Sequence, residues 1–239
     1  MKQITLTILL LILIVEFSFS QTMYIYTKND STYQFNLSEI DSITFSVSNI
    51  IFEENFESYP VNTFPASGGW FLRYNGAGDA YQVVINSEHH SGSQCMQIKG
   101  APNWTAQMEK SVIMNSNLIY YEGWIKPTGN DGGFGLINSQ IPTTGNYGGV
   151  FFDQGKIKCQ VGYHLTVDIQ DFIPNQWYQI KLRYDHDNKT IDVWIDGVLK
   201  VQSLKAIDIS PLGPNVFYMW SEHEGNIFYF DDIKIWYEL

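Results

Sequence analysis

The chain has 239 residues, of which 44% are hydrophobic, 15% aromatic and only 16% charged. An average soluble domain carries ~25% charged residues, and the abundance of apolar and aromatic side chains excludes a largely disordered chain. Lys and Arg number 14 against 25 Asp and Glu, which gives a formal charge of -11. A chain so poor in cations lacks the groups that neutralise phosphates, so nucleic acid and anionic membranes are excluded as expected partners.

The first segment of the chain is predicted to be a secretory signal. Residues 4–19 form the only long apolar run, and Ser18 and Ser20 stand at the small-residue positions that a signal peptidase reads. The run is shorter than the ~20 residues that cross a bilayer, and Glu16 interrupts it, so cleavage is favoured over retention as a membrane anchor. We therefore expect a signal peptide over residues 1–20, a secreted or cell-surface protein, and no membrane insertion after cleavage.

Residues 21–48 are predicted to form a short leader. Aromatic-rich runs at residues 23–27 and 32–36 flank a polar turn at residues 28–31, which is the pattern of a β-hairpin, and residues 40–45 are a further candidate strand. A piece this short cannot bury enough apolar surface to be stable alone, so we expect it to dock on something else. The segment resembles a leader found at the front of many secreted bacterial surface proteins, a resemblance that implies no chemistry.

Residues 49–239 show one pattern throughout: short runs with period-two alternation, separated by Gly, Asn, Asp and Pro. In residues 177–184 the apolar side chains fall on one face and the polar ones on the other, and residues 191–195 alternate equally well before the Asp196-Gly197 turn. Further runs of this kind lie at residues 94–99, 120–126, 149–152, 156–161, 216–221 and 227–236. About nine or ten strands without a long helical segment predict an all-β antiparallel sandwich, since each half-apolar sheet needs a second sheet to cover it.

The two cysteines, Cys95 and Cys159, leave two alternatives open. An oxidising compartment permits a disulfide between them. Both also lie in strand-like runs, where buried free thiols behave as small apolar side chains.

Two neighbouring segments carry a resemblance to a known family. Residues 175–185, in which a Trp opens a strand that ends in Tyr-Asp, and residues 191–197, which end in Asp-Gly, look like the hairpin of concanavalin A-like, laminin G-type jelly rolls. Residues 52–60 leading to Trp70, and the closing run at residues 230–235, also resemble that family. The resemblance implies a jelly-roll β-sandwich over residues 49–239. It leaves function open among lectins, carbohydrate-binding modules, adhesion domains, glycoside hydrolases and lyases.

The hypothesis that this protein is an enzyme finds little support in the sequence. Glycosidases of this fold resemble one another in a Glu-x-Asp-x-x-Glu strand, and this chain has no such string. The nearest approach is Glu222-His223-Glu224 beside Trp220, which Gly225 follows, so a solvated hairpin tip is expected there. No His or Cys spacing suggests zinc. We expect a non-catalytic protein; a glycoside hydrolase or polysaccharide lyase with an unrecognised site is the alternative.

Four acidic residues are candidate ligands of a structural calcium ion. The first and last strands of a jelly roll commonly lie side by side, so Glu54 and Glu57 are expected near Asp231 and Asp232. Calcium takes 6 to 8 oxygen ligands and would clamp the two chain ends together, and many carbohydrate-binding jelly rolls that resemble this chain hold calcium there. Ordinary edge-strand charges that discourage aggregation are the alternative interpretation.

Aromatic side chains outside the core are the candidate ligand-binding residues, because the C–H faces of a sugar ring stack on Trp or Tyr. Most rings of a sandwich are expected in its core. The candidates are Trp104, Trp124, Tyr147, Trp194 and Trp220, with Asn138, Gln140, Asn146 and Gln160 as polar companions and residues 130–149 as the loop of greatest interest. The expected partner is a glycan or polysaccharide, and an extracellular protein is the alternative.

Overall fold

The computed structural model describes residues 22–26, 32–36, 48–73, 81–102, 104–113, 116–139, 146–162, 165–207 and 214–238. The chain divides into two compact units, residues 1–46 and 47–239. The predicted signal peptide and the candidate strand at residues 40–45 lie outside the described residues. Within them, no helix combines the length and apolar character that a membrane crossing requires.

The first unit contains one antiparallel hairpin. Strand β1 (Thr22–Tyr26) pairs with β2 (Thr32–Asn36), with Tyr24 opposite Gln34. This register agrees with the hairpin predicted from the two aromatic-rich runs.

The second unit is built from two antiparallel sheets and one 3-10 turn, η3 (Ala66–Gly68). The eight-stranded sheet has the order β15-β14-β13-β8-β17-β6-β5, and β3 pairs with β17 beside this path. Its strands are β3 (Ser48–Glu54), β5 (Gln82–Ile85), β6 (Cys95–Lys99), β8 (Leu118–Pro127), β13 (Tyr178–Asp185), β14 (Thr190–Ile195), β15 (Val198–Lys205) and β17 (Ile227–Glu238).

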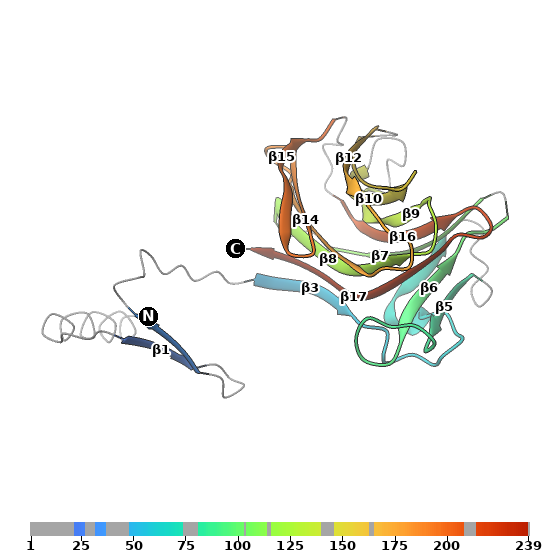
Figure 1. The fold of residues 1–239 in the computed structure, drawn as a ribbon, viewed down its shortest axis with the longest axis horizontal. Coiled ribbons are helices and arrows are strands. Elements are labelled where there is room, and N and C mark those ends of the chain that lie inside the picture. Colours follow the sequence, from blue (N-terminus) through green and yellow to red (C-terminus); the bar gives the residue numbers. More distant parts are fainter. Residues whose placement is uncertain are drawn as a thin grey trace, which may run out of the picture. The chain divides into compact units, whose positions relative to one another are not determined.

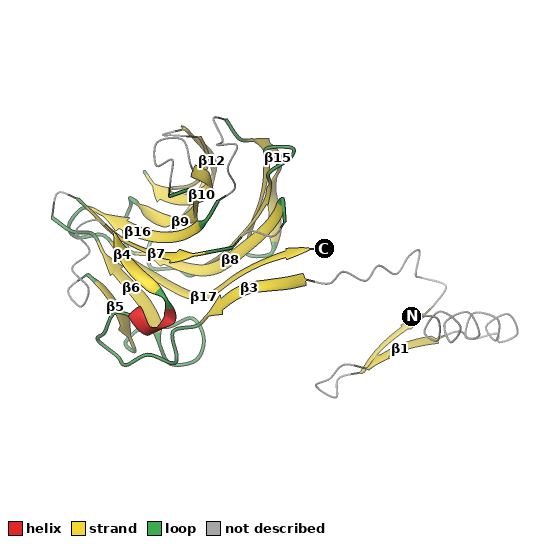
Figure 2. Cartoon of the chain, turned by 180° about the vertical axis from the view of Figure 1, so that it is seen from behind, coloured by secondary structure: helices red, strands yellow, loops and turns green. Residues whose placement is uncertain are grey.

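The seven-stranded sheet has the order β12-β11-β10-β9-β16-β7-β4. Its strands are β4 (Trp70–Arg73), β7 (Thr105–Ser111), β9 (Gly132–Ile137), β10 (Asn146–Asp153), β11 (Lys156–Gly162), β12 (Leu165–Asp171) and β16 (Val216–Glu222). Figure 1 and Figure 2 show the two sheets stacked and curved in the same sense, with the seven-stranded sheet on the inside of the curve. The outer face of this sheet is therefore concave, and it is called the concave face below.

The core lies between the sheets and is rich in aromatic rings. Tyr121, Tyr184, Phe134, Phe217 and Phe228 are among its largest fully buried side chains. Burial removes a large apolar area from water, which is the main favourable contribution to folding. The sandwich predicted from alternation is thus confirmed.

The hairpin that carries the family resemblance forms as predicted. In β13 the side chains alternate between buried and half-buried along the whole strand, and Leu182 pairs with Val193 across to β14. Asp196 and Gly197 form the following turn, with φ of 52° and 76°. Both residues are in the left-handed region that a tight Asp-Gly turn requires.

The sandwich has more strands than the nine or ten expected. Strands β12 and β15 were missed because they lie at the edges of their sheets, where most of their residues are exposed and hydrophobic alternation is lost. Cys95 and Cys159 are buried free thiols in different sheets, so the disulfide alternative does not apply to this structure.

Candidate functional site

The concave face carries a second set of buried aromatic side chains. Along β16, Phe217 and Met219 point into the core, while Val216, Tyr218 and Trp220 point to the opposite face. Successive residues of a strand alternate between faces, so the neighbouring strands present alternate residues there as well. The pairing register of the strands therefore determines which side chains lie on the concave face.

Two rows of side chains cross the concave face perpendicular to the strands. The first row runs from β4 to β12 through Arg73, Gln107, Trp220, Gly133, Phe151, Lys158 and Asp168. The second row runs beside it through Phe71, Glu109, Tyr218, Gly135, Gly149, Gln160 and Thr166. Aromatic, charged and amide groups, with three glycines among them, are thus distributed across seven strands.

Glycine makes room for the rings at the centre of these rows. A Cβ atom on Gly133 would lie 1.8 Å from the carbonyl oxygen of Val150 and 3.1 Å from Cη2 of Trp220. A Cβ on Gly135 would lie 3.2 Å from Cε1 of Tyr218. The rings of Tyr218 and Trp220 therefore lie against backbone, stacked with centroids 5.1 Å apart.

A hollow of about 330 Å³ opens at one end of the rows. We call this site the hollow; it is lined by Asp131, Gly132, Phe151, Asp153, Lys158, Gln160, Thr166, Trp220 and Glu222. Its volume is at the small end of the range typical of ligand pockets, about 300 to 1,000 Å³. Trp220 is only 6% exposed, so its indole contributes a wall of the hollow rather than an open plate.

The polar groups of the hollow are mostly acceptors. Lys158 Nζ donates to Asp153 Oδ2 at 2.7 Å and to Gln154 Oε1 at 3.4 Å. Partial burial, a hydrogen bond with Asp153 and the negative charge of Asp153 raise the pKa of Asp131. The carboxyl of Asp131 therefore holds its proton to a higher pH than an isolated aspartate does.

Gln160 supplies the most informative polar atom of the hollow. Its side chain is 3% exposed and its Nε2 donates to the carbonyl oxygen of Gly162 at 3.0 Å. Its Oε1 is buried without a hydrogen-bond partner. A buried acceptor without a partner is costly, so a donor on a ligand would be favoured at this point.

The opposite end of the concave face holds a second polar cluster. Glu109 is fully buried; Gln107 Nε2 donates to its Oε1 at 2.7 Å, and Arg73 lies 3.2 Å from the same oxygen. Burial raises the pKa of Glu109, although Arg73 and Gln107 oppose the shift. Burial first, and then the charges of Glu109 and Glu222, raise the pKa of Tyr218. These groups give the concave face hydrogen-bonding capacity at both ends.

Among the predicted aromatic residues whose side chains the structure describes, only Trp220 lines the hollow. The side chain of Tyr147 lies outside the described residues. Trp104 is 52% exposed and lies beside the β16–β17 turn, where its carbonyl oxygen accepts from the N–H of His223 at 3.2 Å. Among the polar companions Gln160 lines the hollow, Asn138 is buried, and the side chains of Gln140 and Asn146 lie outside the described residues.

Trp124 and Trp194 lie on the outer face of the other sheet and are engaged in packing. The ring of His90 stacks on Trp124 with a centroid distance of 3.6 Å and an interplanar angle of 13°. Lys181 Nζ lies 4.8 Å from the ring centroid of Trp194. Asp192, on the same face of β14 as Trp194, accepts from the N–H of Ser203 at 2.6 Å.

The junction of the first and last strands is confirmed, with Glu54 opposite Ile233. Glu54 is nevertheless buried in a set of protein donors. It accepts from Tyr59 Oη at 2.6 Å, from Trp70 Nε1 at 3.0 Å and from the N–H of Phe56 at 3.1 Å. Lys110 Nζ lies 3.8 Å away. Its lone pairs and its charge are therefore matched within the protein.

The other three expected calcium ligands accept hydrogen bonds from residues 86–94, the connection between β5 and β6. Glu57 accepts from the N–H groups of Ser93 and Gln94 at 2.7 and 2.8 Å. Asp231 Oδ2 accepts from the N–H groups of His90 and Ser91 at 2.9 and 3.1 Å. Asp232 lies 2.9 Å from His90 Nδ1 and 2.8 Å from Ser91 Oγ.

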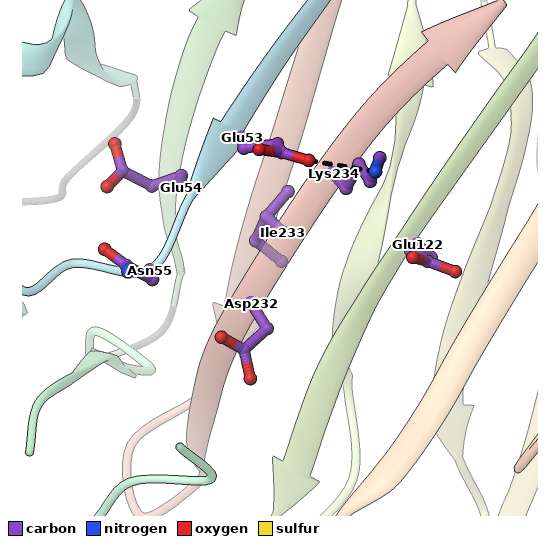
Figure 3. Close-up of a pocket in the computed structure, with 7 residues that line it drawn as sticks. All are labelled: Glu53, Glu54, Asn55, Glu122, Asp232, Ile233 and Lys234. Carbon is purple, nitrogen blue, oxygen red and sulfur yellow. Dashed lines mark ion pairs between the residues drawn. The ribbon is translucent and has the colours of Figure 1, made fainter. Parts of the chain in front are cut away.

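These four carboxylates do not fit one calcium centre. In the described part of the chain no group of three or more Asp, Glu, His or Cys side chains is placed to hold a metal ion. Figure 3 shows that the carboxylates of Glu54 and Asp232 do not converge, although both line a pocket of about 360 Å³. This pocket also contains the ion pair between Glu53 and Lys234, at 2.9 Å, and has no aromatic wall. We therefore place the candidate ligand site in the hollow.

The Glu222-His223-Glu224 segment is divided by the turn. His223 has a φ of 61° and, like Glu224, is exposed, as predicted for a hairpin tip. Glu222 is the last residue of β16 and lines the hollow. In residues 156–161 apolar and polar side chains alternate, which predicts that Lys158 and Gln160 share the face opposite the apolar side chains. Both residues line the hollow. Asp131 precedes a pair of glycines and looks like an ordinary turn residue, so nothing in the sequence indicated that it lines the hollow.

Comparison with known proteins adds the fold but no sequence family. No protein-family model matches the chain, and no curated protein matches its sequence. Solved structures do match. One is a carbohydrate esterase from the Shiga toxin-encoding bacteriophage phi24B, with a TM-score of 0.58, 12% identity, and coverage of 80% of this chain and 99% of that chain. Another is domain 4 of a GH43 extracellular arabinanase from Geobacillus stearothermophilus in complex with arabinotriose, with a TM-score of 0.52, 15% identity, and coverage of 80% and 93%.

A sialidase also matches, with a TM-score of 0.57 and 10% identity over 77% of this chain. The chain spans only 18% of the sialidase's length. At identities this low the likeness establishes architecture and not activity. The described sandwich shares the architecture of two stacked antiparallel sheets with these structures, as expected for a jelly roll.

Proposed function

We propose that residues 48–238 are a non-catalytic carbohydrate-binding module of an exported protein, and that a glycan chain lies along the concave face. The observation that carries the proposal is the hollow itself, in which the rings of Trp220 and Phe151 stand beside carboxylates and the unpartnered Oε1 of Gln160. Sugar rings offer apolar C–H faces to aromatic walls and hydroxyl donors to such acceptors.

The dimensions of the concave face suit a chain rather than a single sugar. Seven strands at roughly 4.8 Å spacing make a face about 29 Å wide from β4 to β12, with polar groups at both ends. The hollow would take one part of the glycan, and the partly exposed guanidinium of Arg73, held by the buried Glu109, would contact another part.

Two structural neighbours support this choice of ligand class. The arabinanase domain was solved in complex with arabinotriose, and another match, at a TM-score of 0.54 and 14% identity, is a cellulose induced protein. Both proteins are covered almost completely by this chain, at 93% and 96% of their length.

The test is polysaccharide binding by the purified chain, measured by affinity electrophoresis and calorimetry on arabinan, xylan, mixed-linkage glucan and glucomannan. Trp220→Ala should weaken binding by about tenfold or more, because it removes the wall of the hollow. Thr166→Trp, at an exposed edge-strand position, should block the hollow without opening a cavity in the core. Trp194→Ala is the matched control on the opposite sheet and should stay within about twofold.

Binding that survives both concave-face substitutions, or that Trp194→Ala weakens most, would contradict the proposal. Thermal melts of each variant separate lost binding from lost folding. No binding to any of the polysaccharides would remove the carbohydrate proposal altogether.

One observation favours a second candidate, glycan cleavage. The raised pKa of Asp131 beside Asp153, with Glu222 in the same hollow, resembles the pairing of a protonated acid and an ionised carboxylate that glycosidases use. Incubation with the same polysaccharides should then release reducing ends, and Asp131→Asn should abolish the release. Release by wild type that Asp131→Asn does not change would contradict a catalytic role of this carboxyl.

A further inference from the structure

The hollow has more negative than positive groups. Asp131, Asp153 and Glu222 line it against the single ammonium of Lys158. The next residue of the first row, Asp168 on β12, is opposite Lys158 and adds a further carboxylate near its rim. Among the described residues, the exposed His223 and the ammonium of Lys158 lower the pKa of Asp131 by smaller contributions.

Lys158 is not positioned to receive a second anion. Its ammonium group is 2.7 Å from Asp153 Oδ2, and the residue is only 9% exposed. A ligand carboxylate would have to displace Asp153 from this ion pair and leave that carboxylate unmatched. Breaking a buried pair in this way is strongly unfavourable.

The hydrogen-bonding character of the lining leads to the same conclusion by an independent route. Gln160 Oε1 is an unpartnered acceptor, and the carboxylates are acceptors when ionised. A sugar hydroxyl can donate to each of them, whereas an ionised uronate group has no proton to donate. The carboxylate oxygens of a uronate would lie close to acceptor groups of the lining. In a partly buried place this contact is unfavourable, because no hydrogen bond forms and the like charges repel.

We propose that the hollow selects uncharged sugar units and excludes uronic acids. This inference rests on the proposed function, because it names the class of glycan that the same site takes. Polymers such as arabinan or glucomannan satisfy it, whereas carboxylate-bearing polymers of the same backbone do not.

The test compares one polysaccharide with its own charged derivative. The uncharged polymer is mixed-linkage glucan or glucomannan, whichever binds better, because their hexose units carry free primary hydroxyl groups. Oxidation of part of these groups turns them into carboxylates without changing the backbone. Wild type should bind the oxidised polymer about tenfold more weakly than the parent, and added salt should narrow this gap. Glu222→Gln, which removes one carboxylate from the lining of the hollow, should reduce the gap to about threefold.

Glu224→Gln is the matched control. It removes the same charge two residues from Glu222, at the exposed tip of the turn and outside the lining of the hollow. It should leave the tenfold gap unchanged.

Equal binding of both polymers by wild type, or an equal narrowing of the gap by Glu224→Gln and Glu222→Gln, would overturn the inference while the proposed function stands. If neither form of any polymer binds, the proposed function fails and the inference falls with it.

Discussion

Trp220 and Phe151 meet edge to face across Gly133, with ring centroids 4.6 Å apart and an interplanar angle of 83°. The two rings come from strands on either side of β9, and only a residue without a side chain at Gly133 lets them meet there. The aromatic wall of the hollow thus depends on a glycine that makes no ligand contact of its own.

Gly133→Ala tests this dependence. The new methyl group would lie 1.8 Å from the carbonyl oxygen of Val150, so β9 and β10 would have to separate and the indole of Trp220 would have to tilt. We expect a loss of about 2 to 3 kcal/mol in the free energy of unfolding, measured by urea denaturation, together with weaker glycan binding.

Gly155→Ala is the control for this experiment. Gly155 has a φ of 73° and open space around it, so its substitution should cost only about 1 kcal/mol through backbone conformation and should leave binding unchanged. Equal losses for both variants would show that close packing at Gly133 is not the cause.

Glu54 and Glu53 are adjacent, but their substitution should destabilise the protein to very different extents. Removal of the Glu54 carboxylate leaves Tyr59, Trp70 and the ammonium of Lys110 without their acceptor in a buried place. Glu54→Ala should therefore cost about 3 to 5 kcal/mol of unfolding free energy. Glu53→Ala breaks only an exposed pair with Lys234 and should change stability by less than about 1 kcal/mol. Similar costs for the two variants would contradict the role assigned to Glu54.

A calcium titration tests the poor fit of the four acidic residues to a metal. Their carboxylates already accept hydrogen bonds from the protein, and Lys110 lies beside Glu54. We expect the same Tm in millimolar calcium and in chelator. An ion present at a hundredfold excess over its Kd would add about 2.7 kcal/mol to stability, so even a modest site would raise Tm by several degrees. Such a rise would restore the calcium expectation.

Local alternation of apolar and polar residues made the sandwich predictable, and it also identified some of the residues that line the hollow. The strands with one apolar face, such as residues 178–185 and 156–162, were visible because side chains there switch face at every residue. The pairing of the first and last strands was expected because jelly rolls commonly place these strands side by side; the structure puts Glu54 opposite Ile233.

The two rows across the concave face were not predictable from the sequence. They depend on the register of six strand pairs, and nothing local in the chain fixes register between strands far apart in sequence. Glu109 and Gln107 lie in a strand without clear hydrophobic alternation, where all but the last two residues are buried. Trp194 was misleading for the same reason: Lys181 lies against its ring and the nearby Asp192 accepts from Ser203, contacts that only the folded sheet reveals.

The pH dependence of stability should contain a contribution from Asp231. Burial raises its pKa to about 6, against the opposing hydrogen bonds from the N–H groups of Ser91 and His90. An unfolded aspartate titrates near pH 3.9, so between roughly pH 4 and 6 the folded state binds more protons than the unfolded state. This group therefore lowers the free energy of unfolding as pH rises through that window, by about 3 kcal/mol in total.

Asp231→Asn should remove this contribution and flatten the fall in stability between pH 4 and 6, measured by urea denaturation at a series of pH values. Glu109 and Asp131 also have raised pKa values and act in the same direction, while the lowered pKa of Glu57 acts in the opposite one. The informative quantity is therefore the difference in slope between wild type and variant, which cancels these shared contributions. Asp187→Asn, in the exposed β13–β14 turn, should leave the slope as it is. A slope that Asp231→Asn does not change would show that this buried carboxyl does not govern the acid side of the stability curve.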